Sequence, residues 1–350
     1  MYNSALGVKV PFNTPIEFFF ALLPLLLLTG FRYGIGADYF NYKIIYERLH
    51  STPFKVYLVN HFGGTSEYYT EIGWYIINRF SYNYNAVLFI AEMIIFTFLY
   101  KGISFFKYSI NVPFAIIIYC FTQLLYSWNG IRFAIAVVII FSGFKYIICK
   151  KLFKYIFTVI IAMLFHKTAV ICVPLYLLTE FKSKKLNSLR NIILYLFVIL
   201  FPLFIKGIIT MSGKIFLFQR YLSAAIYAIG DFHFTPMFIF HVIPVIIPLL
   251  IYGRQLFKND VIAKILLRIY LLEIPFREAG MISKYLTRLS RFPQVVGIIL
   301  VPYVLESLPR KWTRIYLYIY FFVWYLFTFF YYAIINDEGC SYPYYSILTF

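Results

Sequence analysis

The sequence is short of charged residues. Only 13% of its 350 residues are Asp, Glu, Lys or Arg, whereas soluble globular proteins carry about 25%. Hydrophobic residues make up 62% of the chain, and they recur in runs of roughly 15–25 residues separated by short basic connections. This composition excludes a water-soluble domain. It predicts an all-α, polytopic transmembrane helical bundle in which residues 1–350 form a single integral membrane domain.

Cysteine and acidic residues are also scarce. The 4 cysteines lie mostly in apolar runs without paired spacing, which excludes a disulfide framework and a cysteine metal site. No metal and no other cofactor is expected. The net charge of +18 is attributed to the cytoplasmic excess of Lys and Arg and to an anionic ligand at the membrane, with no nucleic acid as a partner.

About ten apolar segments are predicted. They lie near residues 15–31, 72–100, 110–127, 130–148, 155–179, 191–209, 233–252, 262–275, 292–306 and 315–335. The start of the chain lacks a basic region and a small-residue cleavage site, so the first apolar helix is expected to be retained in the membrane.

Lysines indicate the orientation of these segments. They cluster in residues 145–154 and 182–185, which the positive-inside rule places in the cytoplasm together with the N-terminus. Segment 155–179 then returns to the side on which it starts, and it breaks at FHKTA. We therefore expect a re-entrant or kinked helical hairpin, with His166 near its tip at a wet cavity. Residues 32–70 are expected to form an outer-face loop with short helices.

Arginines outnumber lysines on the predicted outer face. Their planar fork of donors suits bidentate contact with phosphate, so a phosphorylated ligand is expected there. The stretch RYGIGADYFNY carries Arg32 and Asp38 around two glycines. One interpretation is a shared cavity at the membrane surface, and the other is an aromatic belt with an Arg32–Asp38 ion pair.

Four further stretches carry candidate residues. Glu71 stands at a helix start in TEIGWYIINRF, where a carboxylate also favours the helix N-terminus. Arg132 begins an apolar helix in SWNGIRFAIAV. It belongs either to a functional site or to the residues that anchor the helix at the membrane interface. His166 lies in LFHKTAV, and SKYLTRLSRFPQVVG presents Arg288 and Arg291.

In this order, the motifs RYGIGADYFNY, EIGW, NGIRFAIA, FHKTA and RLSRF resemble those of the bacterial polysaccharide repeat-unit polymerases of the EpsG/Wzy-like type, over roughly residues 20–300. The resemblance implies O-antigen, capsule or exopolysaccharide synthesis at the periplasmic or outer face of the bacterial inner membrane. The substrate would be undecaprenyl-diphosphate-linked oligosaccharide, with a possible chain-length regulator as partner.

The resemblance also implies a metal-independent glycosyl transfer by a glycosyltransferase. Asp38, Glu71 and His166 are the candidates for the base. The candidates for diphosphate binding are Arg32, Arg132, Arg220, Arg288 and Arg291, and those for sugar contact are Tyr33, Tyr39, Tyr42 and Trp74. Two other classes stay open, a flippase or exporter of the lipid-linked sugar and a membrane O-acyltransferase.

Overall fold

The computed structural model describes residues 14–62, 70–212, 237–279, 287–335 and 340–348. Within these ranges the regular structure is helical, apart from one isolated bridge between Arg32 and Ser346. The all-α prediction is therefore confirmed. The chain divides into two compact units. The first unit comprises Met1–Tyr146, Lys151–Val173 and Tyr318–Phe350, and the second comprises Ile147–Lys150 and Pro174–Leu317.

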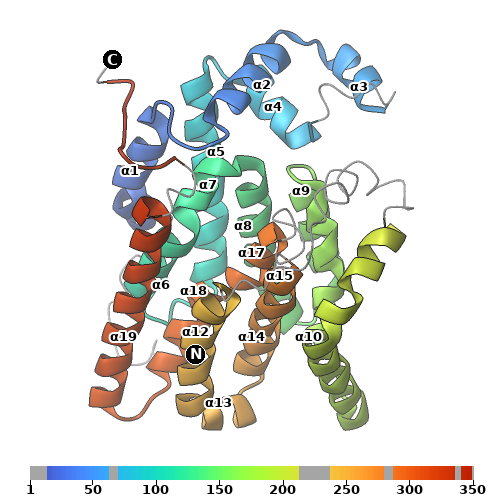
Figure 1. Cartoon of the computed structure of the whole chain (residues 1–350), viewed down its shortest axis with the longest axis vertical. Coiled ribbons are helices and arrows are strands. Elements are labelled where there is room, and N and C mark those ends of the chain that lie inside the picture. Colours follow the sequence, from blue (N-terminus) through green and yellow to red (C-terminus); the bar gives the residue numbers. More distant parts are fainter. Residues whose placement is uncertain (1–13, 63–69, 213–236, 280–286, 336–339, 349–350) are drawn as a thin grey trace. The chain divides into compact units, whose positions relative to one another are not determined.

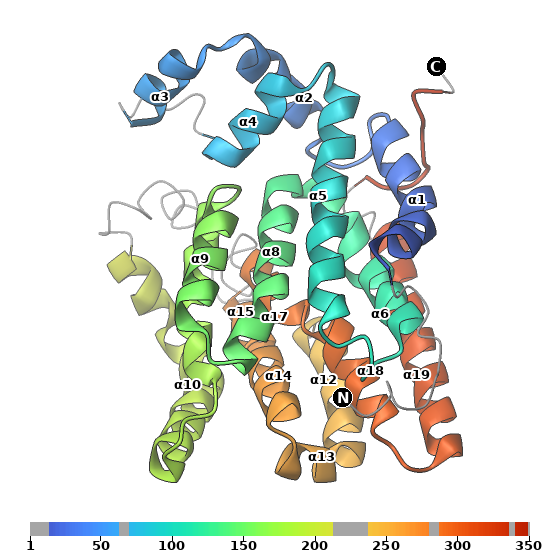
Figure 2. The ribbon, with the colours of Figure 1, turned by 180° about the vertical axis from the view of Figure 1, so that it is seen from behind.

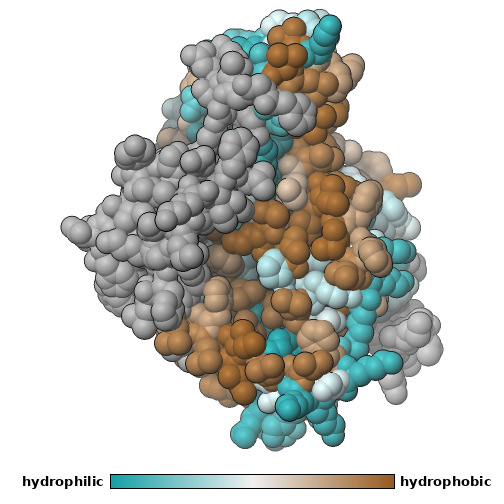
Figure 3. All heavy atoms as spheres, turned by 90° about the vertical axis from the view of Figure 1, so that its right-hand side faces the viewer, coloured by the Kyte–Doolittle hydropathy of each residue, from teal (hydrophilic) through white to brown (hydrophobic). Residues whose placement is uncertain are grey.

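In the described part of the chain, 5 helical stretches are long and apolar enough to cross a membrane. They are α5 (Tyr84–Ser104), Val112–Asn129, α8 (Ile131–Ile148), Arg288–Glu306 and Lys311–Ile335. Shorter apolar helices are α1 (Pro15–Phe31), α9 (Leu152–Met163), the 3-10 helix η4 (Lys167–Leu178) and the Phe240–Tyr252 part of α12. In the view of Figure 3, hydrophobic side chains occupy much of the described surface, and hydrophilic side chains lie at its top, on its right and at its lower edge. The chain is a multi-pass membrane protein.

The first unit is built on α1 and α5. These helices pack so closely that a Cβ added at Gly30 would lie 2.2 Å from the Phe89 ring. The short helices α2 (Tyr39–Ser51), α3 (Phe54–Phe62) and α4 (Ile72–Phe80) lie together beyond the end at which α5 begins (Figures 1 and 2). The Tyr84 hydroxyl donates to the Tyr39 carbonyl at 3.0 Å and holds α2 on this end of α5.

The predicted single segment 72–100 is wrong, because it forms two helices. α4 ends at Phe80, and α5 begins at Tyr84. Between them, the Asn83 side chain accepts a hydrogen bond from the backbone N–H of Ala86 at 2.8 Å. A capping side chain of this kind starts a new helix even within an apolar run, because it satisfies an N–H that has no intrahelical partner.

Three helical pieces follow α5. They are α6 (Val112–Tyr119), the π-helical turn η3 (Cys120–Leu124) and α7 (Leu125–Asn129), which form one continuous stretch. Gly130 separates α7 from α8, so that Arg132 stands in the first turn of α8 as predicted. The helix α19 (Lys311–Phe330) continues into a π-helical turn, Tyr331–Ile335.

Segment 155–179 reverses direction at residues 164–166, between α9 and η4. In the first unit the Tyr155 hydroxyl of α9 donates to the Cys172 carbonyl of η4 at 2.7 Å, so the two arms lie side by side. In the second unit the Thr179 hydroxyl donates to the Ile147 carbonyl at 2.9 Å. Ile147 lies at the end of α8, shortly before segment 155–179 begins, so the segment ends close to where it starts. The lysine clusters of residues 145–154 and 182–185 flank this point.

The second arm, η4, is longer than an α-helix with the same number of residues. The 12 residues of η4 form a 3-10 helix, which rises about 2.0 Å per residue instead of about 1.5 Å, so that it extends about 24 Å. α9 packs closely on α8, since a Cβ added at Gly143 would lie 2.8 Å from the Thr158 methyl group. The reversal at residues 164–166 can therefore reach the level at which α8 begins.

The second unit contains the remaining helices of the described residues. They are α10 (Lys184–Ser212), α12 (Met237–Tyr252), α13 (Arg254–Asn259), α14 (Val261–Leu271), α15 (Glu273–Ala279), a 3-10 turn (Arg288–Ser290), α17 (Arg291–Gln294) and α18 (Gly297–Glu306). α14 packs on α18, and the Tyr303 hydroxyl donates to Asp260 at 3.1 Å.

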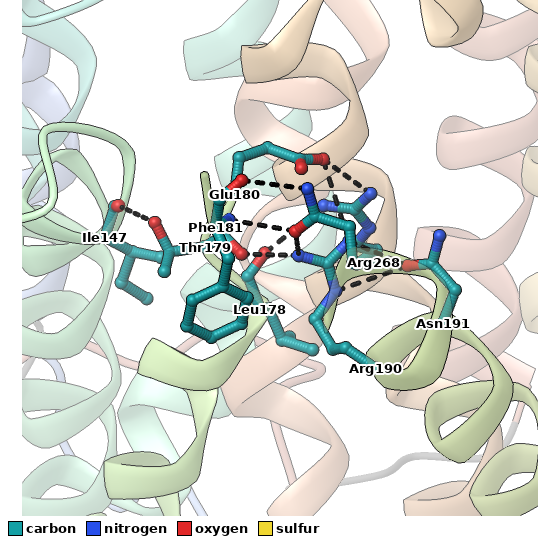
Figure 4. A network of polar contacts seen from close by, with 9 residues as sticks. Ile147, Leu178, Thr179, Glu180, Phe181, Arg190, Asn191 and Arg268 are labelled. Atoms are coloured by element: carbon teal, nitrogen blue, oxygen red, sulfur yellow. Dashed lines mark hydrogen bonds and ion pairs between the residues drawn. The ribbon is translucent and has the colours of Figure 1, made fainter. Parts of the chain in front are cut away.

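A polar network closes the end of η4 in the second unit (Figure 4). Glu180 accepts from Arg268 at 2.7 Å, and Arg190 lies 3.7 Å from the same oxygen. Arg190 also donates to the Thr179 carbonyl, and Arg268 donates to the Leu178 carbonyl at 3.4 Å. The last carbonyls of a helix lack intrahelical partners, so these two arginines complete the helix end.

The loop after α1 docks on the end of α7. Gly36 has a φ of +102°, and a Cβ added to it would lie 2.7 Å from the Trp128 carbonyl oxygen. The backbone N–H of Ala37 donates to the Asn129 side chain at 2.6 Å. Only glycine fits this left-handed, closely approached position.

We expect Gly36→Ala to lower the free energy of unfolding by about 1–3 kcal/mol, because the new Cβ meets both the strained φ and the Trp128 carbonyl. The control is Gly130→Ala, whose φ is −107° and whose nearest neighbour to an added Cβ lies at 3.4 Å. Denaturant unfolding of both purified variants measures the effect. Equal stability of the two variants would contradict the docking argument.

Candidate functional site

A buried ion pair joins two of the predicted motifs. The Glu71 Oε2 and Arg132 Nη1 atoms lie 2.7 Å apart, with side-chain exposures of 1% for Glu71 and 21% for Arg132. Glu71 precedes α4, and Arg132 stands in the first turn of α8. An ionised carboxylate is costly to bury unless it is paired and hydrogen-bonded, so this contact ties the two helix starts together.

The same carboxylate holds the hairpin tip. Glu71 Oε1 accepts from the backbone N–H of Lys167 at 3.3 Å. Two residues after Glu71, the backbone N–H of Gly73 donates to the Leu164 carbonyl at 2.7 Å. A Cβ on Gly73 would lie 2.7 Å from that oxygen, so glycine permits the contact. The hairpin tip therefore lies at the start of α8, beside Arg132.

His166 is half-buried at this tip. Its Nδ1 lies 2.6 Å from the Thr168 hydroxyl, and its ring meets Phe133 edge-on, with 5.1 Å between ring centroids. When Nδ1 carries the proton and donates to Thr168, Nε2 keeps the lone pair that a general base needs. The arrangement suits proton transfer at the hairpin tip.

Aromatic side chains surround the ion pair. The Arg132 guanidinium lies 5.9 Å from the centre of the Tyr42 ring, and Tyr42 meets Trp74 edge-on at 5.4 Å. Tyr42, Trp74 and Tyr39 are buried, whereas Tyr33 is 37% exposed. Of the four predicted sugar contacts, Tyr33 is therefore the exposed one, and the other three pack within the first unit.

Arg32 and Asp38 do not form the predicted alternative, an ion pair. Among the described residues, Arg32 is fully buried with its guanidinium 5.6 Å from the centre of the Trp128 ring. Asp38 is half-buried just before α2 and accepts from the Asn41 side chain at 3.4 Å. Gly34 and Gly36, with φ of +65° and +102°, turn the chain between them, so sequence proximity does not bring the two charges together.

Two of the other predicted arginines lie in the second unit. Arg291 lies in the second unit, where its Nη1 donates to Gln294 at 2.9 Å, and Arg288 begins a 3-10 turn of the same unit. Arg220 lies outside the described residues. Within the described ranges, no group of three His, Cys, Asp or Glu side chains gathers closely enough to hold a metal ion.

Sequence reasoning missed His61, which stands in α3. The Tyr57 hydroxyl donates to the Thr70 carbonyl at 2.7 Å and lies 3.3 Å from His61 Nδ1. Burial and the positive charge of Lys167 lower the pKa of His61, while Thr70 and Glu71 act in the opposite direction. The spacing of four residues between Tyr57 and His61 on one helix face was the signal for this pair.

Four sequence-distant stretches thus meet in the first unit: the loop after α1, the starts of α4 and α8, and the hairpin tip. The chain is thus a multi-pass helical membrane protein that carries a paired arginine, a histidine and packed aromatic side chains at its helix ends. Residues 16–346 match the model of the EpsG family, and the chain belongs to this family. Family membership indicates a role in polysaccharide biosynthesis.

The predicted resemblance to the EpsG family is therefore confirmed. No curated protein and no solved structure matches the chain.

We expect the protein to lose thermal stability as the pH falls below about 6.5, the ordinary pKa of histidine, in part through His61. A lowered pKa in the folded state means that the unfolded chain binds the proton more readily, so protonation favours unfolding. His61→Gln, which cannot take up this proton, should lose less stability between pH 7.5 and 5.5. Melting temperatures across this range test the prediction, and identical pH profiles would contradict it.

Proposed function

We propose that the protein joins undecaprenyl-diphosphate-linked oligosaccharide repeat units into O-antigen, capsule or exopolysaccharide on the periplasmic or outer face of the bacterial inner membrane. Membership of the EpsG family supports polysaccharide synthesis. The observation that carries the chemistry is the Glu71–Arg132 pair at the hairpin tip. It presents an arginine beside a histidine at the start of a membrane helix.

In the proposed orientation the N-terminus lies in the cytoplasm and segment 155–179 is a re-entrant hairpin. The Thr179–Ile147 contact at its base supports this arrangement, because it brings the lysine clusters of residues 145–154 and 182–185 to one end. The tip with His166 then faces the outer side, together with Arg132 and residues 32–70.

The proposed reaction is a metal-independent glycosyl transfer. A hydroxyl oxygen of the acceptor sugar attacks the anomeric carbon of the donor, and the bond from that carbon to the diphosphate breaks. The released undecaprenyl diphosphate carries the negative charge, which Arg132 stabilises. His166 Nε2 takes the proton of the acceptor hydroxyl, while the Thr168 hydroxyl holds Nδ1.

Glu71 is assigned a positioning role. Its two oxygens are engaged by Arg132 and by the Lys167 backbone, which fixes the guanidinium plane for bidentate contact with a phosphate. Asp38 and the exposed Tyr33 flank the loop after α1, and we assign them to the acceptor sugar. Arg220, Arg288 and Arg291 stay candidates for contacts to diphosphate.

We expect Arg132→Lys to reduce polymer formation about tenfold to a hundredfold, because lysine keeps the charge but loses the fork of donors. Membrane abundance of the variant should stay close to wild type. Arg79→Lys is the control, since Arg79 donates to the His50 carbonyl in the same unit. The measurement is the polysaccharide ladder in a strain that lacks the chromosomal gene. Wild-type chain lengths from Arg132→Lys would remove Arg132 from the site.

The same strain without any complementing copy separates the classes. Loss of a polymerase leaves single repeat units at the surface. Loss of an exporter leaves none there, and loss of an O-acyltransferase leaves full-length polymer without acyl groups.

We expect His166→Gln and Asp38→Asn to differ. His166→Gln should abolish polymer and leave single-unit product at normal protein abundance, because glutamine takes up no proton. Asp38→Asn, which keeps hydrogen bonding, should shorten the chains and raise the acceptor concentration needed for half-maximal rate. Long polymer from a stably expressed His166→Gln variant would refute the assignment of the base.

A further inference from the structure

Arg32 is an unusual arginine. Its side chain is 0% exposed, and within the described structure none of its three guanidinium nitrogens has a hydrogen-bond partner. No ion pair reaches it there either. Arginine stays protonated in proteins, so the molecule buries a full positive charge and five donors without a direct partner. Such an arrangement is costly and is retained where the charge has a ligand to meet.

The surroundings of Arg32 lower the free-energy cost of burying its charge but do not remove it. Its guanidinium lies 5.6 Å from the centre of the Trp128 ring, a cation–π contact that uses the face of the cation. Glu92 of α5 acts on it electrostatically, but this carboxylate accepts its own hydrogen bond from the Tyr119 hydroxyl at 3.3 Å. The donors of the guanidinium fork are therefore held in place and left for an anion.

Residues 340–348 pair with the backbone at Arg32, and Tyr344 of this segment acts electrostatically on the Arg32 guanidinium. We call residues 340–348 the covering segment. Two backbone hydrogen bonds, Tyr33 N–H to Tyr345 carbonyl at 2.9 Å and Ile347 N–H to Phe31 carbonyl at 2.8 Å, form the bridge at Arg32 and Ser346. Several of its own side chains are exposed, among them Tyr342, Tyr345 and Leu348. A short surface segment with few backbone bonds opens at low cost.

The place of Arg32 in the chain indicates the ligand. It directly follows α1, whose apolar side chains Phe20, Leu23 and Leu27 are exposed. A prenyl tail fits along such a face, and the phosphates at its end would lie where the helix stops and the arginine begins. A free phosphate gains nothing from this apolar face.

We propose that Arg32 binds the diphosphate of a prenyl diphosphate lipid and that the covering segment moves aside to admit it. This inference rests on the proposed function, because that function supplies the lipid diphosphate. It adds a second phosphate-binding residue to Arg132 and a cover that separates the empty from the loaded state. The hydrogen bond from the Tyr344 hydroxyl to the Leu28 carbonyl, at 2.8 Å, must break when the covering segment moves aside.

The first test is binding of farnesyl diphosphate, a soluble prenyl diphosphate, to the purified full chain. Arg32→Met should weaken binding at least tenfold while the melting temperature stays equal or rises, because methionine removes a buried unpaired charge at similar volume. Arg48→Met is the matched control, since Arg48 is exposed on α2, and it should bind as wild type does. Unchanged binding by Arg32→Met would overturn the proposal, and so would equal affinity for inorganic pyrophosphate.

The second test locks the cover. Tyr33 and Tyr345 face each other across the bridge, so Tyr33→Cys with Tyr345→Cys can form a disulfide, with Cys149 and Cys340 replaced by serine. The oxidised protein should lose farnesyl diphosphate binding at least tenfold and regain it on reduction. Undiminished binding by the oxidised form would refute the moving cover.

The two proposals fail separately. Normal prenyl diphosphate binding by Arg32→Met, together with loss of polymer in Arg132→Lys, overturns the role of Arg32 and leaves the proposed function in place. Weakened binding by Arg32→Met, together with normal polymer in Arg132→Lys, supports a prenyl diphosphate site and contradicts the polymerase centre.

Discussion

The structure of the first unit depends on the burial of one carboxylate. Glu71 is almost completely shielded from solvent, and its two oxygens accept from Arg132 and from the Lys167 backbone. Because an unpaired carboxylate in an apolar interior is costly, the starts of α4 and α8 and the hairpin tip must stay in contact. The contact with Lys167 holds the residue that follows His166, so the histidine lies next to this constraint.

Close backbone approach is the second condition for this site. At Gly36 and at Gly73 a carbonyl oxygen of another segment comes so close that an added Cβ would lie 2.7 Å from that oxygen. The loop after α1 thereby reaches the end of α7, and the start of α4 reaches the hairpin tip. Loop residues are usually variable in position, but here two glycines hold them against helix ends, which keeps the candidate groups in fixed places.

Much of the helical layout could be read from the sequence. The start and end of α1 and the span of α8 agree with prediction, and the reversal in segment 155–179 lies at FHKTA. The break at Asn83 was missed, because hydropathy runs through it while a single capping side chain divides the helix. His61 was missed as well: the spacing from Tyr57 marks the pair, but Lys167 and Glu71, which act on its pKa, come from other segments.

The sequence by itself determined that this chain is a multi-pass helical membrane protein of the EpsG family, because hydropathy, the lysine distribution and motif order are properties of local stretches. Only the tertiary structure decided which charges meet. Glu71 pairs with Arg132, 61 residues away, while Arg32 and Asp38, six residues apart, do not pair. Pairing depends on how helices pack and where glycines let backbones touch, and no local pattern specifies either.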